Sequence, residues 1–233
     1  MTTIDLNADV GEGADDDALY PLLSSINVAC GGHAGDERSM TAAVESALTH
    51  GLALGAHPSY PDTDRFGRVS IAMAHDALAD VIASQLAALA EIAEARGAPL
   101  RHVKPHGALY NDAARDPAIA AAIADGVARV DHSLLLFGLA GSTAIAVWRD
   151  LGWRCAEEGF CDRGYERDGS LVARSKPGAL LTDPGDASAQ AVRLASEGRC
   201  RTLCVHSDTP GAAAILAVVR KELTAAGFGI TPP

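Results

Sequence analysis

LRHVKPHGALYN, residues 100–111, is the stretch around which the rest of the chain can be organised. It begins as a short β-strand, passes through Lys104, Pro105 and His106, and continues as the start of a helix. In α/β proteins, the chemistry lies at the carboxyl ends of the strands. A lysine and a histidine at such a point therefore predict a β/α fold with functional side chains along one edge.

The same pattern of a short strand, a polar turn and an amphipathic helix recurs along the chain. Further strands are predicted at Thr3–Asp9, Ile26–Cys30, Leu52–Ala56, Ser133–Leu139, Trp153–Phe160 and Thr202–His206, with Ala179–Thr182 left open as an eighth. Capping residues and prolines predict helix starts at Asp36, Asp116-Pro117, Asp183-Pro184 and Asp208-Thr209-Pro210. The alternation predicts one domain, residues 1–233, with a parallel sheet and helical crossovers.

Polar residues follow nearly every predicted strand, rather than only two neighbouring strands. An open sheet gathers its site where the strand order reverses, whereas a barrel gathers it from the ends of many strands. Both arrangements fit the alternation, and the distribution of polar residues favours the closed barrel.

The composition excludes several classes of partner. The 233 residues carry a formal net charge of -11, which argues against nucleic acid and anionic membranes as partners. The nearly apolar run Leu134–Trp148 is shorter than the ~20 residues that span a bilayer. Five cysteines without a C-x-x-C pair, and an N-terminus without a signal pattern, predict a reduced, cytoplasmic protein.

The first predicted strand has an unusual polar face. Asp5, Asn7 and Asp9 alternate with Ile4, Leu6 and Ala8, so the three polar side chains share one side of the strand. Burying such a face is costly unless it lines a polar interior or a site. A solvated edge strand is the alternative that the pattern leaves open.

The candidate site residues lie at or just after the predicted strands. They are Asn7, Asp9, Gly31, His33, Asp36, His57, Lys104, His106, Glu158, Asp162, His206 and Asp208. Three chemistries fit this set. Asp9, His57 and His106 could bind a divalent metal ion; Lys104 and the histidines could bind an anionic substrate and transfer protons; or Cys30 could act as a nucleophile.

The sequence has no standard nucleotide-binding loop. It contains neither G-x-x-x-x-G-K-[ST] nor a strand-linked G-x-G-x-x-G, and it also lacks the G-x-S-x-G elbow of serine hydrolases. A reaction that needs ATP would therefore need another place to hold it.

Several long motifs resemble those of a known family. They are DLNADVGE (Asp5–Glu12), NVACGGHAGD (Asn27–Asp36), GAHPSYPD (Gly55–Asp62), HVKPHGALYN (His102–Asn111), GLAGS (Gly138–Ser142), FCDRGYERDGSLVARSKPGAL (Phe160–Leu180) and CVHSDTP (Cys204–Pro210). They span the whole chain in order, and they closely resemble the LamB/YcsF family, which includes the A subunit of bacterial 5-oxoprolinase.

The resemblance implies an irregular (β/α)7 barrel related to glycoside hydrolase and deacetylase folds. It also implies ATP-dependent opening of 5-oxoproline (pyroglutamate) to L-glutamate, together with separate B and C subunits. Binding of ATP with those partner subunits would account for the missing phosphate loop.

On this hypothesis, Lys104 binds the substrate carboxylate or developing negative charge, and His33 and His106 exchange protons. Asp9 is a general base or a metal ligand, while His57, His206 and Asp208 orient the substrate or the metal. Asn7 and Gly31 complete the predicted substrate-binding set. Two rival hypotheses are a metal-dependent deacetylase or amidohydrolase that acts without ATP, and a subunit that only binds substrate.

Overall fold

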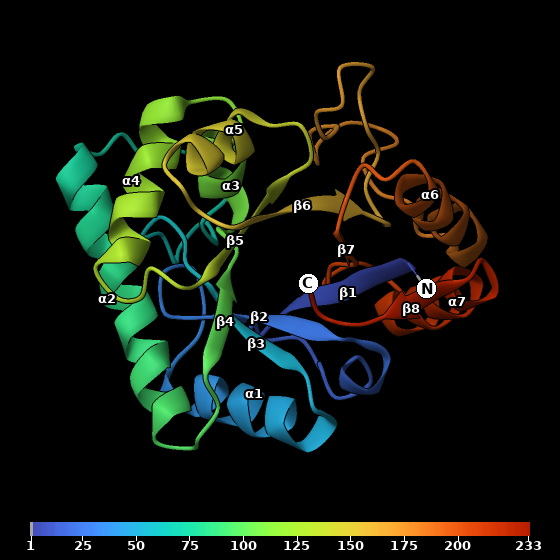
Figure 1. Cartoon of the computed structure of the whole chain (residues 1–233), viewed down its shortest axis with the longest axis horizontal. Helices are drawn as coiled ribbons and strands as arrows, with labels where there is room; N and C mark the ends of the chain where they lie inside the picture. The colour runs from blue at the N-terminus through green and yellow to red at the C-terminus, as the bar shows by residue number, and fades with distance from the viewer. Residues whose placement is uncertain (1) are drawn as a thin grey trace.

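Parallel strands close into a seven-membered barrel in the computed structural model, which describes residues 2–233 (Figure 1). The ring runs β2-β3-β4-β5-β6-β7-β1 and closes where β1 pairs with β2. The strands are β1 (Thr2–Val10), β2 (Ser25–Ala29), β3 (Ala53–His57), β4 (Leu100–Val103), β5 (Leu135–Leu139), β6 (Cys155–Phe160), β7 (Thr202–Cys204) and β8 (Phe228–Ile230). The predicted (β/α)7 barrel is confirmed.

Helices surround the ring of strands (Figure 1). They are α1 (Glu37–His50), α2 (His75–Glu94), α3 (Gly107–Ala113), α4 (Pro117–Ala128), α5 (Thr143–Asp150), α6 (Pro184–Ser196) and α7 (Ala212–Ala225), with a 3-10 turn at Tyr20–Leu22. The predicted caps at Asp36, Asp116 and Asp183 each accept a hydrogen bond from a backbone N–H of the first turn. These bonds satisfy donors that a helix leaves free at its start.

One predicted helix start is wrong, and one strand that the sequence left open is not formed. Helix α7 begins at Ala212 instead of Asp208, because Gly211 takes a left-handed conformation (φ 79°) and serves as the N-cap. Ala179–Thr182 is not a strand, since Leu180 makes only an isolated bridge to Arg163. The eighth strand is β8, which follows the last helix and pairs with the start of β1.

The polar face of β1 lies inside the barrel. Asp5, Asn7 and Asp9 are all buried, and β1 sits between β7 and β2. The edge-strand alternative is therefore wrong. Asp5 accepts hydrogen bonds from the hydroxyls of Ser24, Ser25 and Thr202, and Asn7 donates to Glu158 of β6 across the interior. The barrel thus has a polar core, which places charged groups beneath its carboxyl end.

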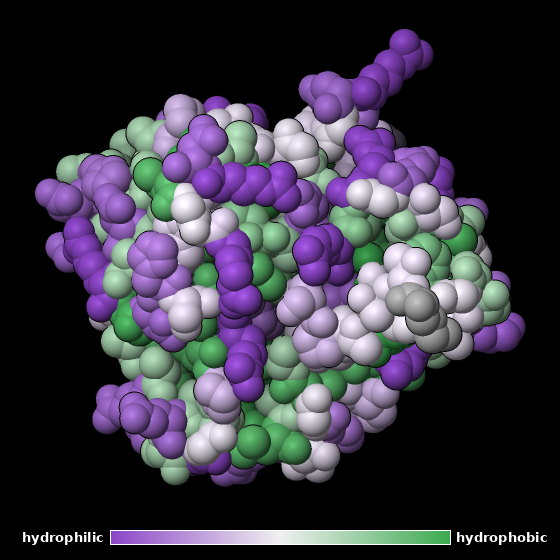
Figure 2. All heavy atoms as spheres, in the orientation of Figure 1, coloured by the Kyte–Doolittle hydropathy of each residue, from purple (hydrophilic) through white to green (hydrophobic). Residues whose placement is uncertain are grey.

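Apolar side chains cover the outside of the barrel. Ile4, Leu6 and Ala8 alternate with the polar face of β1 and are fully buried against the helical layer. On the face shown in Figure 2, hydrophilic residues are interspersed with smaller hydrophobic areas. Within residues 2–233, no helix combines the length and the apolar character that crossing a bilayer requires.

Replacing Asp5 by asparagine should flatten the pH dependence of stability between about pH 4 and 6. Burial raises the pKa of Asp5 to about 6, from an ordinary value of 3.8. The folded state therefore keeps a proton that the unfolded chain releases, and stability falls as the pH rises through this window. The shift corresponds to about 3 kcal/mol, so Asp5→Asn should gain up to about that much stability at pH 7.

Urea unfolding at a series of pH values measures this effect. The exposed Asp64→Asn variant is the matched control for the loss of one carboxylate. An Asp5→Asn profile as steep as that of the wild type would show that Asp5 does not hold the proton.

Candidate active site

Lys104, just after β4, is the centre of a buried charge network. Its Nζ atom lies 2.8 Å from Asp9 Oδ1, 2.9 Å from Glu158 Oε1 and 3.4 Å from Asn7 Oδ1. Burial disfavours the charged ammonium, but attraction to Asp9 and Glu158 outweighs this and raises the pKa of Lys104 well above its usual value. The three hydrogen bonds of the ammonium group go to Asp9 Oδ1, Asn7 Oδ1 and Cys204 Sγ, while Glu158 forms an ion pair with it.

Four side chains from successive strand ends form a second cluster, the Glu12 cluster, made of Glu12, His33, His57 and His106. One ligand-type atom from each side chain lies within 4.8 Å of the others. Glu12 Oε1 is 2.7 Å from His33 Nε2, 3.2 Å from His106 Nδ1 and 3.6 Å from His57 Nε2. The His33 and His106 rings stack in parallel, 3.6 Å between centroids.

Burial and charge set the protonation of this cluster. Burial lowers the pKa of His33 to about 4 and also lowers that of His106, so both rings are neutral near pH 7. Burial alone would lower the pKa of His57 as well, but the negative charge of Asp9 outweighs it and raises that pKa. For Glu12, hydrogen bonds with His106 and His33 overcome the effect of burial and lower the pKa.

His206, after β7, is held by Asp162, after β6. Its Nδ1 atom lies 3.0 Å from Asp162 Oδ1, and its backbone N–H donates to Asp162 Oδ2 at 3.0 Å. Thr209 donates its hydroxyl to the same carboxylate, and the Phe160 ring stacks on the imidazole. The His206 side chain is 14% exposed, against 7% or less for the histidines of the Glu12 cluster. It is therefore the imidazole of the site that is most open to a ligand.

Charged side chains from three loops meet at the mouth of the barrel. Asp208 pairs with Arg68 and Arg174, at 2.5 Å and 3.0 Å. The Arg68 guanidinium lies 4.8 Å from the centre of the Phe66 ring, which in turn packs on His33 and His106. These layers cover the Glu12 cluster.

The sequence relatives agree with this architecture. A sequence model of the LamB/YcsF family matches residues 4–233. The chain belongs to the LamB/YcsF family. The A subunit of 5-oxoprolinase from Chloroflexus aurantiacus is 44% identical over 251 residues, covering 100% of this chain and 99% of that protein.

Solved structures place this LamB/YcsF barrel among known folds. The lactam utilization protein from Thermus thermophilus matches with a TM-score of 0.92 and 39% identity, covering 99% of each chain. The catalytic domain of a peptidoglycan N-acetylglucosamine deacetylase from Eubacterium rectale matches with a TM-score of 0.56 and 11% identity, covering 100% of this chain and 88% of that one. The second likeness concerns the fold alone and fits the predicted deacetylase-like barrel.

The LamB/YcsF barrel brings together most of the residues predicted from the sequence. Those that gather in the two clusters or beside them are Asn7, Asp9, His33, His57, Lys104, His106 and His206. Gly31 and Asp208 do not join them. Gly31 is exposed and has a positive φ of 98°, so it shapes the loop that carries His33, and Asp208 stays in its ion pairs at the mouth.

The surroundings of Lys104 and Cys30 bear on two roles considered from the sequence. The Lys104 ammonium faces Asp9, Glu158 and Asn7, so a substrate carboxylate would have to displace one of them, and its binding by Lys104 stays a prediction. Cys30 is unsuited as a nucleophile, because burial raises the pKa of its thiol to about 12. A thiol with that pKa carries almost no thiolate at neutral pH.

Sequence reasoning missed Glu12, Asn27 and His102. Glu12 lies two residues beyond the end of β1, so the rule that selected His33 would also have selected it. Asn27 donates to Asp9 at 2.9 Å, and His102 contacts Asn27 at 2.9 Å inside the barrel. His102 precedes Lys104 by two residues, and this spacing places both side chains on the inward face.

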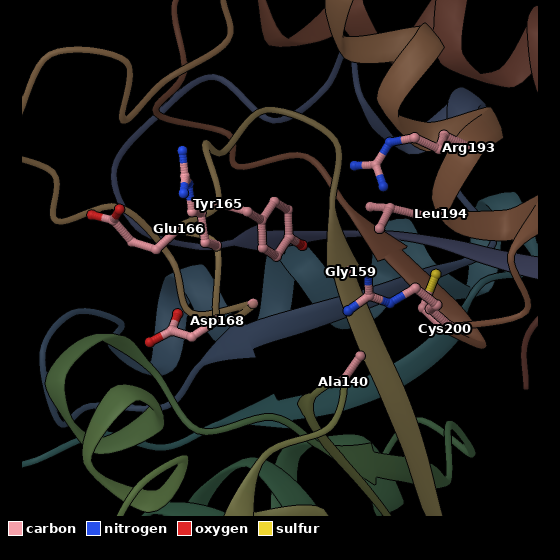
Figure 3. Close-up of a pocket in the computed structure, with 11 residues that line it drawn as sticks. Ala140, Gly159, Tyr165, Glu166, Asp168, Arg193, Leu194 and Cys200 are labelled. Carbon is pink, nitrogen blue, oxygen red and sulfur yellow. The ribbon is translucent and has the colours of Figure 1, made fainter.

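A cavity of about 250 Å³ lies elsewhere, on the outer side of β6 (Figure 3). It is bounded by Gly159, the loop at Tyr165–Gly169, and Arg193 and Leu194 of α6. Glu158, the neighbour of Gly159, points instead toward Lys104 inside the barrel. The wall of the barrel therefore separates this cavity from the candidate active site.

Proposed function

We propose that the chain opens 5-oxoproline to L-glutamate as the A subunit of an ATP-dependent 5-oxoprolinase. The observation that carries this proposal is the full-length match to a relative that is named as the A subunit of 5-oxoprolinase. The name lactam utilization protein of the Thermus structure supports a cyclic amide as the substrate. The buried carboxylates and imidazoles at the carboxyl end of the barrel supply suitable acid–base groups.

ATP would overcome the stability of the amide. Transfer of its terminal phosphoryl group to the lactam oxygen forms ADP and a phosphoimidate, which is a better electrophile. Water adds to that carbon, the ring nitrogen takes a proton as the C–N bond breaks, and a second water releases phosphate from the resulting acyl phosphate. Because the chain has no phosphate-binding loop, we assign ATP binding to a complex with B and C subunits, in the cytoplasm where ATP is available.

The geometry suggests roles for individual side chains. Asp9 is held by Lys104 and Asn27 and would accept a proton from the attacking water. His206, oriented by Asp162, would donate a proton to the ring nitrogen. Lys104 acts through Asp9 and is a positioning residue. The Glu12 cluster has the donors to hold a divalent cation, which would polarise a carbonyl oxygen or a water molecule.

An assay of glutamate formation from 5-oxoproline tests the proposal. The purified chain would be assayed alone and with B and C subunits, with and without ATP, beside the Chloroflexus relative as a positive control. We expect glutamate only when the partners and ATP are both present. If the relative supports turnover with those partners and this chain does not, the proposed reaction is wrong.

A metal-dependent amidohydrolase or deacetylase that needs no ATP is the second candidate function. The Glu12 cluster favours it, because three imidazoles and a carboxylate form a donor set suited to a catalytic metal. Such an enzyme would cleave acetylated or cyclic amides without ATP and lose activity when EDTA is added. Glutamate formation that depends strictly on ATP would exclude this candidate.

A further inference from the structure

We propose that Glu12, His33, His57 and His106 bind one divalent metal ion, and that Zn²⁺ is the cation their donor set fits best. This inference rests on the geometry of the cluster and does not depend on the lactam reaction. It also replaces the metal set predicted from the sequence, which paired Asp9 with His57 and His106. Asp9 lies beside the cluster, with its Oδ2 atom 3.3 Å from His57 Nε2, but its Oδ1 atom is bound by Lys104 and Asn27.

Backbone carbonyls fix the tautomers of two of the histidines. His57 Nδ1 lies 2.7 Å from the carbonyl oxygen of Lys104, and His106 Nε2 lies 3.0 Å from that of Phe66. A carbonyl oxygen can only accept, so both of these ring nitrogens carry hydrogen. The nitrogen left to bind a metal ion is therefore the other one, Nε2 of His57 and Nδ1 of His106.

Those two ring nitrogens face each other. His57 Nε2 and His106 Nδ1 are 3.0 Å apart, and both rings are buried. Two ring nitrogens at this distance repel one another unless a proton, which His57 carries when it is charged, or a metal ion lies between them. Metal-binding histidines commonly show this arrangement, in which the outer ring nitrogen donates to a carbonyl and the inner nitrogen faces the metal.

The size of the cluster suits a tetrahedral ion. Zinc bonds of 2.0–2.1 Å to nitrogen and oxygen place neighbouring donors about 3.3 Å apart. Four of the six distances between donor atoms in the cluster are 2.7, 3.0, 3.2 and 3.6 Å, which bracket that value, and all six are within 4.8 Å. His33 faces the cluster through Nε2, which lies 2.7 Å from Glu12 Oε1, while its Nδ1 atom on the far side of the ring is buried without a hydrogen-bond partner among residues 2–233.

The buried negative charge around the cluster would also be stabilised by a cation. The carboxylates of Asp9 and Glu158 both contact the Lys104 ammonium, and the Glu12 carboxylate contacts the three histidines of the cluster. Uncompensated charge in a protein interior is costly. A divalent cation in the Glu12 cluster would balance the negative charge that Lys104 leaves, in the place of a proton on His57.

A strained loop holds the outer side of this cluster in place. Phe66 has a positive φ of 56°, a conformation that bulky residues rarely adopt. A Cβ atom on the neighbouring Gly67 would lie only 2.9 Å from His33 Cβ and 3.1 Å from His106 Cδ2. The loop thus passes close over both histidines, and this places the Phe66 carbonyl on His106. Strain of this kind persists where the surrounding structure enforces it, commonly at functional sites.

Metal binding by the purified chain tests the inference without any activity assay. Zn²⁺ would be titrated into metal-free protein by calorimetry, and Co²⁺ would be added to record its visible absorption. We expect one ion per chain and the intense absorption of tetrahedral Co²⁺. A chain that takes up less than one ion, or gives only the weak absorption of octahedral Co²⁺, would overturn the proposal in favour of a shared proton between His57 and His106.

Substitutions of single residues test which side chains bind the ion. Glu12→Gln and His106→Gln should each weaken Zn²⁺ binding by about 100-fold or more, because each removes a direct ligand. His206→Gln is the matched control, since His206 belongs to a different group with Asp9 and Cys204, and it should keep wild-type affinity. The opposite result, in which only His206→Gln loses the ion, would assign the metal to that second group. Circular dichroism checks that each variant is folded. Because these experiments measure metal binding, their results do not depend on whether the lactam assay succeeds.

Discussion

Replacing His206 by asparagine should lower kcat for glutamate formation by about a thousandfold, with the fold intact. His206 is the most exposed imidazole of the candidate site, and Asp162 orients it through Nδ1. Its other ring nitrogen is therefore free to face a ligand. Without the imidazole, the ring nitrogen of the lactam would have to leave without a positioned proton donor. The KM for 5-oxoproline should change much less than kcat.

Asp162→Asn is the companion variant, and it tests whether the carboxylate acts through His206. The amide can present its NH₂ group to the imidazole and favour the wrong tautomer, so kcat should fall by about 100-fold or more. Burial would raise the pKa of Asp162, but the neighbouring His206 outweighs it and lowers that pKa. The carboxylate is therefore ionised at neutral pH, and the substitution removes a charge.

Asp208→Asn is the control for both variants. Asp208 lies two residues beyond His206, but its carboxylate pairs with Arg68 and Arg174 at the mouth. Its loss should alter KM more than kcat. A chain that only binds substrate would tolerate the loss of His206 and Asp162, so wild-type kcat in His206→Asn would support that rival instead.

Replacing Lys104 by methionine should destabilise the protein by about 3–5 kcal/mol. The methionine side chain fills a similar space, but it leaves Asp9 and Glu158 buried without their cation. Both carboxylates would then have to pick up protons or remain charged in the interior, and each course reduces stability. Urea unfolding at pH 7 measures the change.

A second substitution distinguishes lost charge from lost packing. In the double variant Lys104→Met/Glu158→Gln one of the two stranded charges is gone, so part of the stability should return and the effects should not add. The exposed Lys176→Met variant removes a surface pair with Glu166 and should change stability by less than about 1 kcal/mol. A Lys104→Met protein as stable as the Lys176→Met control would show that the network does not support the fold.

Much of the barrel could be predicted because its signals are local. Alternation in β1, capping aspartates before α1, α4 and α6, and polar residues after successive strands are all visible within a few positions. Strand β8 could not be predicted, since its three residues become a strand only through pairing with Thr2–Ile4. Tertiary contacts of this kind leave no periodic pattern.

The sequence predicted which residues lie in the candidate site better than it predicted the contacts between them. The rule that strand ends converge selected His33, His57 and His106 correctly as neighbours. It could not show that Lys104 faces two carboxylates, because Asp9, Lys104 and Glu158 come from β1, the end of β4, and β6, which do not pair with one another. Distances across a barrel interior depend on its closure, and the separate strands do not encode them.

The position of β1 in the ring has a consequence for biosynthesis. Within the barrel, this strand is translated before the other strands, yet two of its neighbours, β7 and β8, are the last strands to be translated. Until then, Asp5 and Asn7 lack Thr202 and Glu158 as partners, and one edge of β1 stays open to pairing with other chains. The nascent barrel therefore keeps an open strand edge at β1 until β7 and β8 have been made.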